Sequence, residues 1–332
     1  MNILFYCPSK FNINSSFIDK LGGIETLNYE LSKELSKKNN INIYLATICN
    51  KIIKNKRLTN LPIKDLVKNE YIFDVIISSN NPIIFNKYLN SKKILWLHNT
   101  LALEKALRKK VLFSILTNKI NVLFVSKYLN QITSKLYFFK KRNILPNFLP
   151  TKFENQKKNY IRKKIFIWSV QRDKGLSNVL NIWTKEIFPK NNDAKLYIFG
   201  INKKSYNKKI PEYRRQNIFF YGRVSKNHLR NTYKKSLAMI CLGYDETFCL
   251  NALEANSCGL PIITFGKTAL KSFTINGKNG YLVDNYNDLA KKIKFLCNSK
   301  LNPKIIKYCY EYSEKFYLKR ISSKWLRLIR AL

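Results

Sequence analysis

LGYDETFCLNALEANSCGLPIITF, at residues 242–265, is the stretch that decides the predicted fold. An apolar run at residues 237–242 leads into it and has the length of a buried parallel strand. The next residues include Asp245, Glu246 and Thr247. Their side-chain oxygens can accept hydrogen bonds from the free N–H groups at the start of a helix. The helix ends before Pro261, and a second apolar strand follows at residues 261–265. Strand, helix and strand in this order indicate a parallel α/β sheet.

Two carboxylates, Glu246 and Glu254, lie close together in this mostly apolar stretch, although the chain has only 20 acidic residues against 61 basic ones. A helix N-terminus offers partial positive charge and unpaired N–H donors, which suit a phosphate. Glu246 would lie at the mouth of such a site and Glu254 further along the helix, where each carboxylate could hold hydroxyls of a sugar. The alternative is that Glu246 is a cap residue and Glu254 a solvated helix position.

The stretch resembles the signature of retaining glycosyltransferases of family 4. In that family a Glu-x7-Glu pair is followed by Ala-x-x-x-Gly-x-Pro and a strand. The matching residues here are Glu246, Glu254, Ala255, Gly259 and Pro261. The resemblance implies the α/β GT-B fold, in which two Rossmann-like, doubly wound parallel-sheet domains face a central cleft. It also implies that Glu246 positions the donor sugar and that Glu254 holds the ribose hydroxyls.

The length of 332 residues suggests two domains or one large one. A chain of 332 residues with 45% hydrophobic residues can bury a full core. No apolar run reaches the ~18 to 20 residues needed to span a membrane, and the start lacks the pattern of a signal peptide. We expect a cytoplasmic protein, with peripheral association on the inner face of the membrane as an alternative. The 7 cysteines form no Cys-x-x-Cys pair, which indicates reduced core residues.

The formal net charge of +41 has two explanations. A polyanion partner, either nucleic acid or an anionic membrane surface, would favour a basic chain. Codon bias would also produce it, because Lys, Asn, Ile and Tyr share AT-rich codons and the lysines are spread throughout. A nucleic-acid-binding protein is the second hypothesis for function, but no recognised binding motif occurs and the basic residues form no stripe.

The first half alternates strands and helices, as a doubly wound sheet does. Strands are expected at residues 2–7, 41–48, 74–79, 93–98 and 121–126. Gly22 and Gly23 precede a helix at 26–37, where their N–H groups could approach an anion. No Gly-x-Gly-x-x-Gly occurs, which counts against a dehydrogenase. The pair resembles the Gly-Gly-x-Glu loop of family 4, which contacts the phosphate side of the donor.

His98 ends one of the expected strands, where ligands of such sheets bind. A lone histidine there can instead be a structural hydrogen-bonding residue, but family 4 enzymes often carry an active-site histidine in the equivalent loop. Residues 101–116 predict one amphipathic helix with a basic face at Lys105, Arg108, Lys109 and Lys110. That face is either solvated or meets anionic headgroups of a membrane.

The domain boundaries follow from composition. Residues 143–149 resemble the Ile-Pro-Asn segment that leads into the family's hinge, and polar residues 151–164 predict a linker. We therefore expect an acceptor-side domain at 1–150 and a nucleotide-sugar-binding domain at 165–310. A C-terminal helix at 311–332 is expected to cross back to the first domain, as is common in this architecture.

The second domain opens with a strand at residues 164–170 and a turn containing Lys174 and Gly175. A lysine there could meet a phosphate as a point charge. The family's turn reads Gly-Arg-x4-Lys-Gly, in which Arg and Lys hold the donor diphosphate. Lys174 and Gly175 match, but Ser169 stands at the Arg position, and Arg172 is the nearby arginine. Either Arg172 reaches the diphosphate from another point or one positive contact is missing.

Further strands are expected at 195–199, 218–221, 237–242, 261–265 and 280–283. Gly222 and Arg223 follow one of them, at the position where the family binds the nucleotide base. Residues 276–283 match the family's Gly-x-x-Gly-hydrophobic-Leu-Val turn, and helices are expected at 288–296 and 305–332.

The resemblance implies retaining transfer of a sugar from a UDP- or GDP-sugar to a glycan or lipid-linked acceptor, in cell-surface polysaccharide or lipopolysaccharide assembly. A sugar-nucleotide epimerase or phosphorylase of the same fold is an alternative. The expected catalytic residues are Glu246, His98 and Lys174. The expected donor-binding residues are Gly22, Gly23, Arg172, Lys174, Gly222, Arg223, Glu246, Thr247, Phe248, Cys249, Leu250 and Glu254. No Asp-x-Asp motif occurs, so neither a metal site nor another cofactor is predicted.

Overall fold

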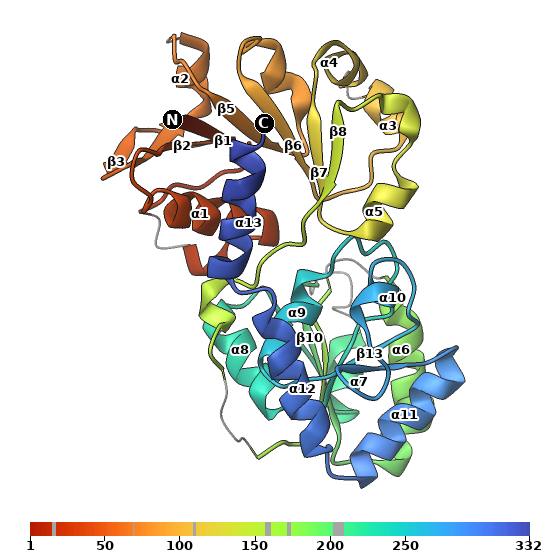
Figure 1. Ribbon diagram of the computed structural model, residues 1–332. Coiled ribbons are helices and arrows are strands. Elements are labelled where there is room, and N and C mark those ends of the chain that lie inside the picture. Colours follow the sequence, from red (N-terminus) through yellow and green to blue (C-terminus); the bar gives the residue numbers. More distant parts are fainter. Residues whose placement is uncertain (15–17, 69, 109–110, 157–160, 171–173, 202–208) are drawn as a thin grey trace. The chain divides into compact units, whose positions relative to one another are not determined.

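The chain divides into two compact units in a computed structural model (Figure 1). Unit 1 comprises Met1–Thr151 and Phe316–Leu332, and unit 2 comprises Lys152–Lys315. The structure describes residues 1–332 except 15–17, 69, 109–110, 157–160, 171–173 and 202–208. Each unit is an α/β domain with its own sheet.

Unit 1 contains an eight-stranded sheet in the order β3-β4-β2-β1-β5-β6-β7-β8. Its strands are β1 (Asn2–Tyr6), β2 (Asn42–Thr47), β3 (Ile53–Asn55), β4 (Leu58–Pro62), β5 (Val75–Ser79), β6 (Lys92–Leu97), β7 (Asn121–Phe124) and β8 (Lys141–Ile144). Neighbouring strands pair in parallel, apart from the antiparallel pair of β3 and β4. The central strands β1 and β5 are apolar runs, as burial on both faces requires.

The helices of unit 1 are α1 (Gly23–Leu35), α2 (Ile63–Lys68), α3 (Leu103–Arg108), α4 (Leu112–Thr117), α5 (Lys127–Ile132) and α13 (Leu318–Arg330). The C-terminal helix α13 packs beside α1 (Figure 1). Its fully buried Trp325 meets Trp96 of β6 edge to face, with ring centroids 4.9 Å apart. This segment, distant in sequence, therefore completes the core of unit 1.

Unit 2 contains a six-stranded, all-parallel sheet in the order β11-β10-β9-β12-β13-β14. Its strands are β9 (Ile165–Trp168), β10 (Lys195–Phe199), β11 (Ile218–Gly222), β12 (Ala238–Ile240), β13 (Ile262–Thr264) and β14 (Gly280–Leu282). Phe166 of β9 is in register with Leu196 of β10 and with Ala238 of β12. The first strand of unit 2, β9, thus lies at the centre of the sheet, between β10 and β12.

The helices of unit 2 are α6 (Leu176–Ile182), α7 (Ile210–Arg215), α8 (Lys226–Lys235), α9 (Leu250–Ser257), α10 (Leu270–Phe273), α11 (Tyr286–Asn298) and α12 (Pro303–Glu314). Helix α9 packs against α8 and α12, whereas α11 packs against α6, and Figure 1 shows these two groups flanking the sheet. The doubly wound α/β fold that the sequence predicts is confirmed in both units.

One local prediction is wrong. Residues 101–116 do not form one helix, because α3 ends at Arg108 and α4 begins at Leu112. The helical character predicted for 305–332 is confirmed, and the stretch is divided between two helices, α12 and α13. The end of the predicted linker is an ordered part of unit 2, where the Arg162 guanidinium donates to the carbonyls of Tyr233, Ser236, Cys258 and Gly259. A cation at these carbonyls complements the C-terminal ends of α8 and α9.

Candidate functional site

The centre of unit 2 has the topology that creates a binding crevice. From β9 the chain winds outward to β10 and β11, and then crosses to β12 on the other side of β9. The connections after β9 and β12 therefore run in opposite directions, which opens a crevice at the carboxyl ends of these two strands. The turn with Lys174 follows β9 and the loop with Glu246 follows β12.

The structure brings Lys174 and Glu246 together at this crevice. Lys174 Nζ lies 2.5 Å from Glu246 Oε1, and the two side chains are 20% and 14% exposed. An ammonium group has three N–H donors, and this bond uses one of them. The pair holds both groups in place, and the ammonium can still donate to an incoming anion.

The turn after β9 packs tightly on the loop after β12. Gly175 has φ 98°, a left-handed conformation that favours glycine, and a Cβ atom there would lie 2.9 Å from Leu242 Cδ1 and 3.1 Å from Tyr244 Cε2. Asn251 Nδ2 also donates to the carbonyl of Ser169 at the end of β9. Glycine at position 175 is therefore required by backbone conformation and by close approach.

Glu246 lies on a tight loop and not on a helix. Gly243, Asp245 and Cys249 all have left-handed φ values, of 89°, 53° and 63°. The carbonyl of Gly243 accepts from Thr268 Oγ1 at 2.7 Å, and the carbonyl of Glu246 accepts from the Ala269 N–H at 3.1 Å. These bonds from the following connection fix the position of the carboxylate.

The expected helix start is wrong by a few residues. Asp245, Glu246 and Thr247 do not cap the helix, because α9 begins at Leu250 after Cys249, which makes no side-chain cap bond. The left-handed turn at Cys249 separates the acidic residues from the helix. Of the predicted donor-binding residues here, Phe248 and Cys249 are buried, whereas Thr247 and Leu250 are partly exposed.

Glu254 is buried inside unit 2, with 5% of its surface exposed, so the alternative of a solvated helix position is wrong. Its charge acts on Tyr233 of α8. Burial first, and the Glu254 charge second, raise the pKa of the Tyr233 hydroxyl well above its ordinary value. A buried carboxylate is costly unless it is paired.

The remaining unit 2 candidates are more dispersed. Gly222 ends β11 with φ 67°, and Arg223 after it is exposed. They share the carboxyl edge of the sheet with Lys174, but β10 separates β11 from β9. Ser169 is buried beside the crevice, and Arg172 lies outside the described residues.

Unit 1 has a similar crossover, in which β1 lies between β2 and β5. Gly22 is the N-cap of α1 and Gly23 its first residue. A Cβ atom on Gly22 would collide with Glu25 Oε2, and Glu25 Oε1 accepts from Ser9 Oγ at 2.9 Å. The glycine therefore makes room for a carboxylate that closes over the helix start. The lysine of this turn whose side chain the structure describes, Lys10, is exposed.

His98 follows β6 and is buried, with 5% exposure. Its backbone N–H donates to Asn80 Oδ1 at 2.7 Å, and its ring centroid lies 4.5 Å from that of Trp96. Burial lowers the pKa of the imidazole from its ordinary 6.5 to about 3, so it is neutral at pH 7. Sequence reasoning missed Asn80, which follows β5 with φ 58° and also accepts from the Asn99 N–H. An asparagine directly after a predicted strand was the available signal.

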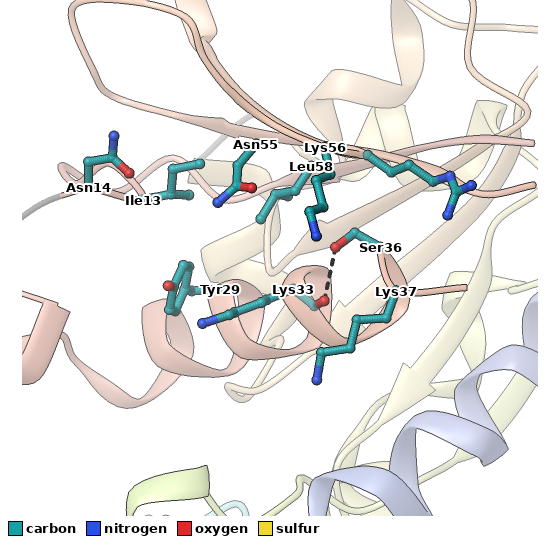
Figure 2. A pocket seen from close by; sticks show the side chains of 10 residues that line it. Ile13, Asn14, Tyr29, Lys33, Ser36, Lys37, Asn55, Lys56 and Leu58 are labelled. Atoms are coloured by element: carbon teal, nitrogen blue, oxygen red, sulfur yellow. Dashed lines mark hydrogen bonds between the residues drawn. The ribbon is translucent and has the colours of Figure 1, made fainter. Parts of the chain in front are cut away.

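Sequence reasoning also missed a basic groove of about 740 Å³ in unit 1 (Figure 2). Side chains of α1 form one wall and the turn between β3 and β4 forms the other. Its cationic lining residues are Lys33, Lys37, Lys56 and Arg57, and the part of the chain that the structure describes adds no carboxylate to this lining. None of the predicted site residues lies in it.

The basic face expected at 101–116 falls mostly outside the described structure. Residues 109–110 are not described, nor are the side chains of Lys105 and Arg108. Among the described residues, no helix combines the length and apolar character that a membrane crossing needs.

The cation and the carboxylate lie at the switch point of an open parallel sheet, which is where α/β proteins of this class bind their ligands. Residues 150–316 match the sequence profile of a family described as Glycosyl transferases group 1. The match covers half of the chain, and the chain belongs to this family. No curated protein matches the chain in sequence.

Solved structures of similar fold include several glycosyltransferases. Sucrose-phosphate synthase from Thermosynechococcus elongatus superposes with a TM-score of 0.76 and 15% identity, covering 99% of this chain and 98% of that one. Anabaena HepE in complex with UDP and glucose gives a TM-score of 0.75 at 14% identity, with 100% of both chains covered. WaaG, a glycosyltransferase involved in lipopolysaccharide biosynthesis, gives 0.73 at 10% identity, covering 98% of this chain and 99% of that one. The fold of this chain is therefore GT-B, as the sequence predicts.

Proposed function

We propose that this protein is a retaining glycosyltransferase that moves a sugar from a nucleoside-diphosphate sugar to an acceptor hydroxyl. The observation that carries the proposal is the ion pair of Lys174 and Glu246 at the switch point of unit 2. The Glu-x7-Glu spacing of Glu246 and Glu254, which resembles that of family 4, supports the retaining outcome.

In this proposal Lys174 donates to the diphosphate of the donor. Negative charge grows on the diphosphate as the bond to the sugar breaks, and a preorganised cation stabilises it most at that moment. The donors that the ammonium does not give to Glu246 serve this purpose. Because an organic cation supplies the charge, the reaction proceeds without a divalent metal ion.

Glu246 positions the donor sugar. Lys174 holds its Oε1, and its other carboxylate oxygen can accept a hydrogen bond from a sugar hydroxyl. Glu254 accepts from the ribose hydroxyls, and the edge at Gly222 and Arg223 serves the base. Gly22, Gly23 and His98 of unit 1 belong to the same proposal. A neutral imidazole can donate one hydrogen bond and accept another, which suits contact with a sugar hydroxyl.

The acceptor is proposed to be a glycan or lipid-linked glycan of the cell surface, on the cytoplasmic side of the membrane. WaaG, whose fold is similar, is described as acting in lipopolysaccharide biosynthesis. The cationic lining of the groove in Figure 2 supports an anionic partner for unit 1.

The test uses the full chain and a panel of UDP- and GDP-sugars. Thermal unfolding with each compound identifies the nucleotide, because a ligand that binds the folded state raises Tm. Incubation with the stabilising compound, with and without a chelator, then identifies the product and the anomeric configuration. We expect stabilisation by one nucleotide series and chelator-resistant transfer with retention. An inverted anomer, an epimerised nucleotide sugar or a free sugar phosphate would each contradict the proposal.

A further inference from the structure

Two thiols of unit 2 meet at the loop that carries Glu246. Cys241 directly follows β12 and Cys249 directly precedes α9. Their sulfur atoms lie 3.4 Å apart, and the two residues are 1% and 6% exposed. The loop thus begins and ends at a thiol, and its closure brings the two together.

The Glu246 carboxylate completes a triad of ligand atoms. Cys241 Sγ, Cys249 Sγ and one Glu246 oxygen all lie within 4.8 Å of one another. In a tetrahedral site with sulfur at about 2.3 Å and oxygen at about 2.0 to 2.2 Å from the ion, ligand atoms lie about 3.5 to 3.8 Å apart. The triad therefore needs shifts of only about 1 Å or less to surround a cation.

The backbone gives an independent reason to regard Cys249 as more than packing. Its φ of 63° is left-handed, a conformation that glycine adopts more readily than residues with a side chain. A side chain at this position therefore carries a strain of about 1 kcal/mol or more. This one is a thiol, and it points at a second thiol and toward a carboxylate.

The charges of the occupied site would balance. Two thiols lose their protons on binding a divalent cation, so two thiolates and the Glu246 carboxylate supply three negative charges. The cation supplies two positive charges and Lys174, 2.5 Å from Glu246, supplies one. A neutral cluster is the arrangement in which buried charge is least costly. Sulfur ligands select soft cations and not magnesium, whose ligands are oxygens.

We propose that Cys241, Cys249 and Glu246 form a site for a thiophilic divalent cation of the zinc class, and that the bound cation inhibits the enzyme. The inhibition rests on the proposed function, because it follows from withdrawing Glu246 from the donor. Lys174 would stay beside the Glu246 carboxylate, as the charge balance requires.

Binding is tested on the full chain, reduced and freed of metal, with Co²⁺ as the spectroscopic substitute for Zn²⁺. Thiolate ligation of Co²⁺ gives a charge-transfer absorption that oxygen ligation does not. We expect one Co²⁺ per chain with this absorption, displaced by Zn²⁺. Cys241→Ser should weaken binding by more than about tenfold, since loss of even an outer-shell partner costs about 10- to 100-fold.

Two further variants keep the test decisive. Cys249→Gly removes the other thiol at a position whose φ suits glycine, so it is expected to fold and to lose the absorption. Cys297→Ser removes a buried thiol of unit 2 that lies outside the triad, and should bind as wild type does. Equal Co²⁺ binding by wild type and Cys241→Ser, or no thiolate absorption in wild type, would overturn the site.

Inhibition is measured separately. Zn²⁺ should slow sugar transfer by the wild type and not by Cys241→Ser, and a chelator should restore the rate. Transfer that continues unchanged with the site saturated would overturn the inhibitory role. Because the absorption requires no turnover, failure of the proposed function would leave the binding result intact.

Discussion

The switch points of the two units share a topology and differ in the side chains that they bring together. In unit 2 the turn after β9 presents Lys174, which pairs with Glu246 from the loop after β12. In unit 1 the turn after β1 holds the Glu25 carboxylate over Gly22, and His98 nearby along the sheet is neutral. The parallel fold supplies a crevice in both cases, but the side chains decide which ligand it suits. A diphosphate is expected at the crevice of unit 2, where the cation is.

The largest expected effect is loss of Lys174, the cation that pairs with Glu246 at the switch point of unit 2. Lys174→Ala should lower kcat/KM for sugar transfer by about 10²- to 10³-fold, which is typical for losing one preorganised group that stabilises transition-state charge. Lys185→Ala removes an exposed lysine of the same unit and is the matched control. A wild-type kcat/KM in Lys174→Ala would contradict a role for the Lys174 cation in sugar transfer.

The glycines of the two turns are predicted to differ in how much they contribute to the stability of their units. Gly175→Ala should lower the free energy of unfolding by about 2 to 4 kcal/mol, because it combines left-handed strain with overpacking against Leu242. Gly22→Ala, at φ −65°, should lower it by about 1 kcal/mol, the worth of the bond between Ser9 and Glu25 that the Cβ would displace. Urea denaturation measures both, and equal losses would show that the two turns are not built differently.

His98 predicts a stability difference that depends on pH. The folded pKa of about 3 lies below the unfolded value of about 6.5, so the unfolded chain binds the proton first as pH falls. The stability tied to the neutral imidazole is complete above about pH 6.5 and is lost progressively below it, by about 2 kcal/mol at pH 5.

The measurement compares unfolding free energies at pH 7.5 and pH 5. His98→Gln should lose less on acidification than wild type by about 2 kcal/mol, whereas His228→Gln, which alters the exposed histidine of α8, is the matched control. An identical pH dependence in wild type and His98→Gln would mean that His98 is not held neutral.

The last prediction concerns the second glutamate. Glu254→Gln keeps the shape of the buried side chain but weakens its acceptance of two hydroxyl bonds, so donor Kd should rise about tenfold with kcat changed less. Glu212→Gln, on the exposed surface of α7, is the control. A normal donor Kd in Glu254→Gln would limit the binding role in unit 2 to Lys174 and Glu246.

The fold was largely readable from the sequence because buried parallel strands are apolar runs. Three strands without that signal were missed: β3 is partly exposed, β4 has the sequence LTNLP with Thr, Asn and Pro in it, and β8, KRNI, is a mostly polar edge strand. The break between α3 and α4 was missed because residues 101–116 keep an apolar periodicity across it. Helix α9 starts late because of a left-handed cysteine, a conformation that residue type does not signal.

The site was only partly readable. The sequence identified Lys174 and Glu246 separately, but their contact depends on β12 lying next to β9, and strand order is not visible in the order of the chain. Burial of Glu254 likewise depends on how α8 and α9 pack. The pairing of Cys241 with Cys249 was missed because a spacing of eight residues brings thiols together only when the loop between them closes.

The most direct test of the account is a crystal structure of the full chain with the nucleoside diphosphate that stabilises it most. The account predicts that the terminal phosphate lies within hydrogen-bond distance of Lys174 Nζ, at the carboxyl ends of β9 and β12, with Glu254 on the ribose. A diphosphate bound elsewhere, with the pair of Lys174 and Glu246 undisturbed and remote from it, would contradict the account.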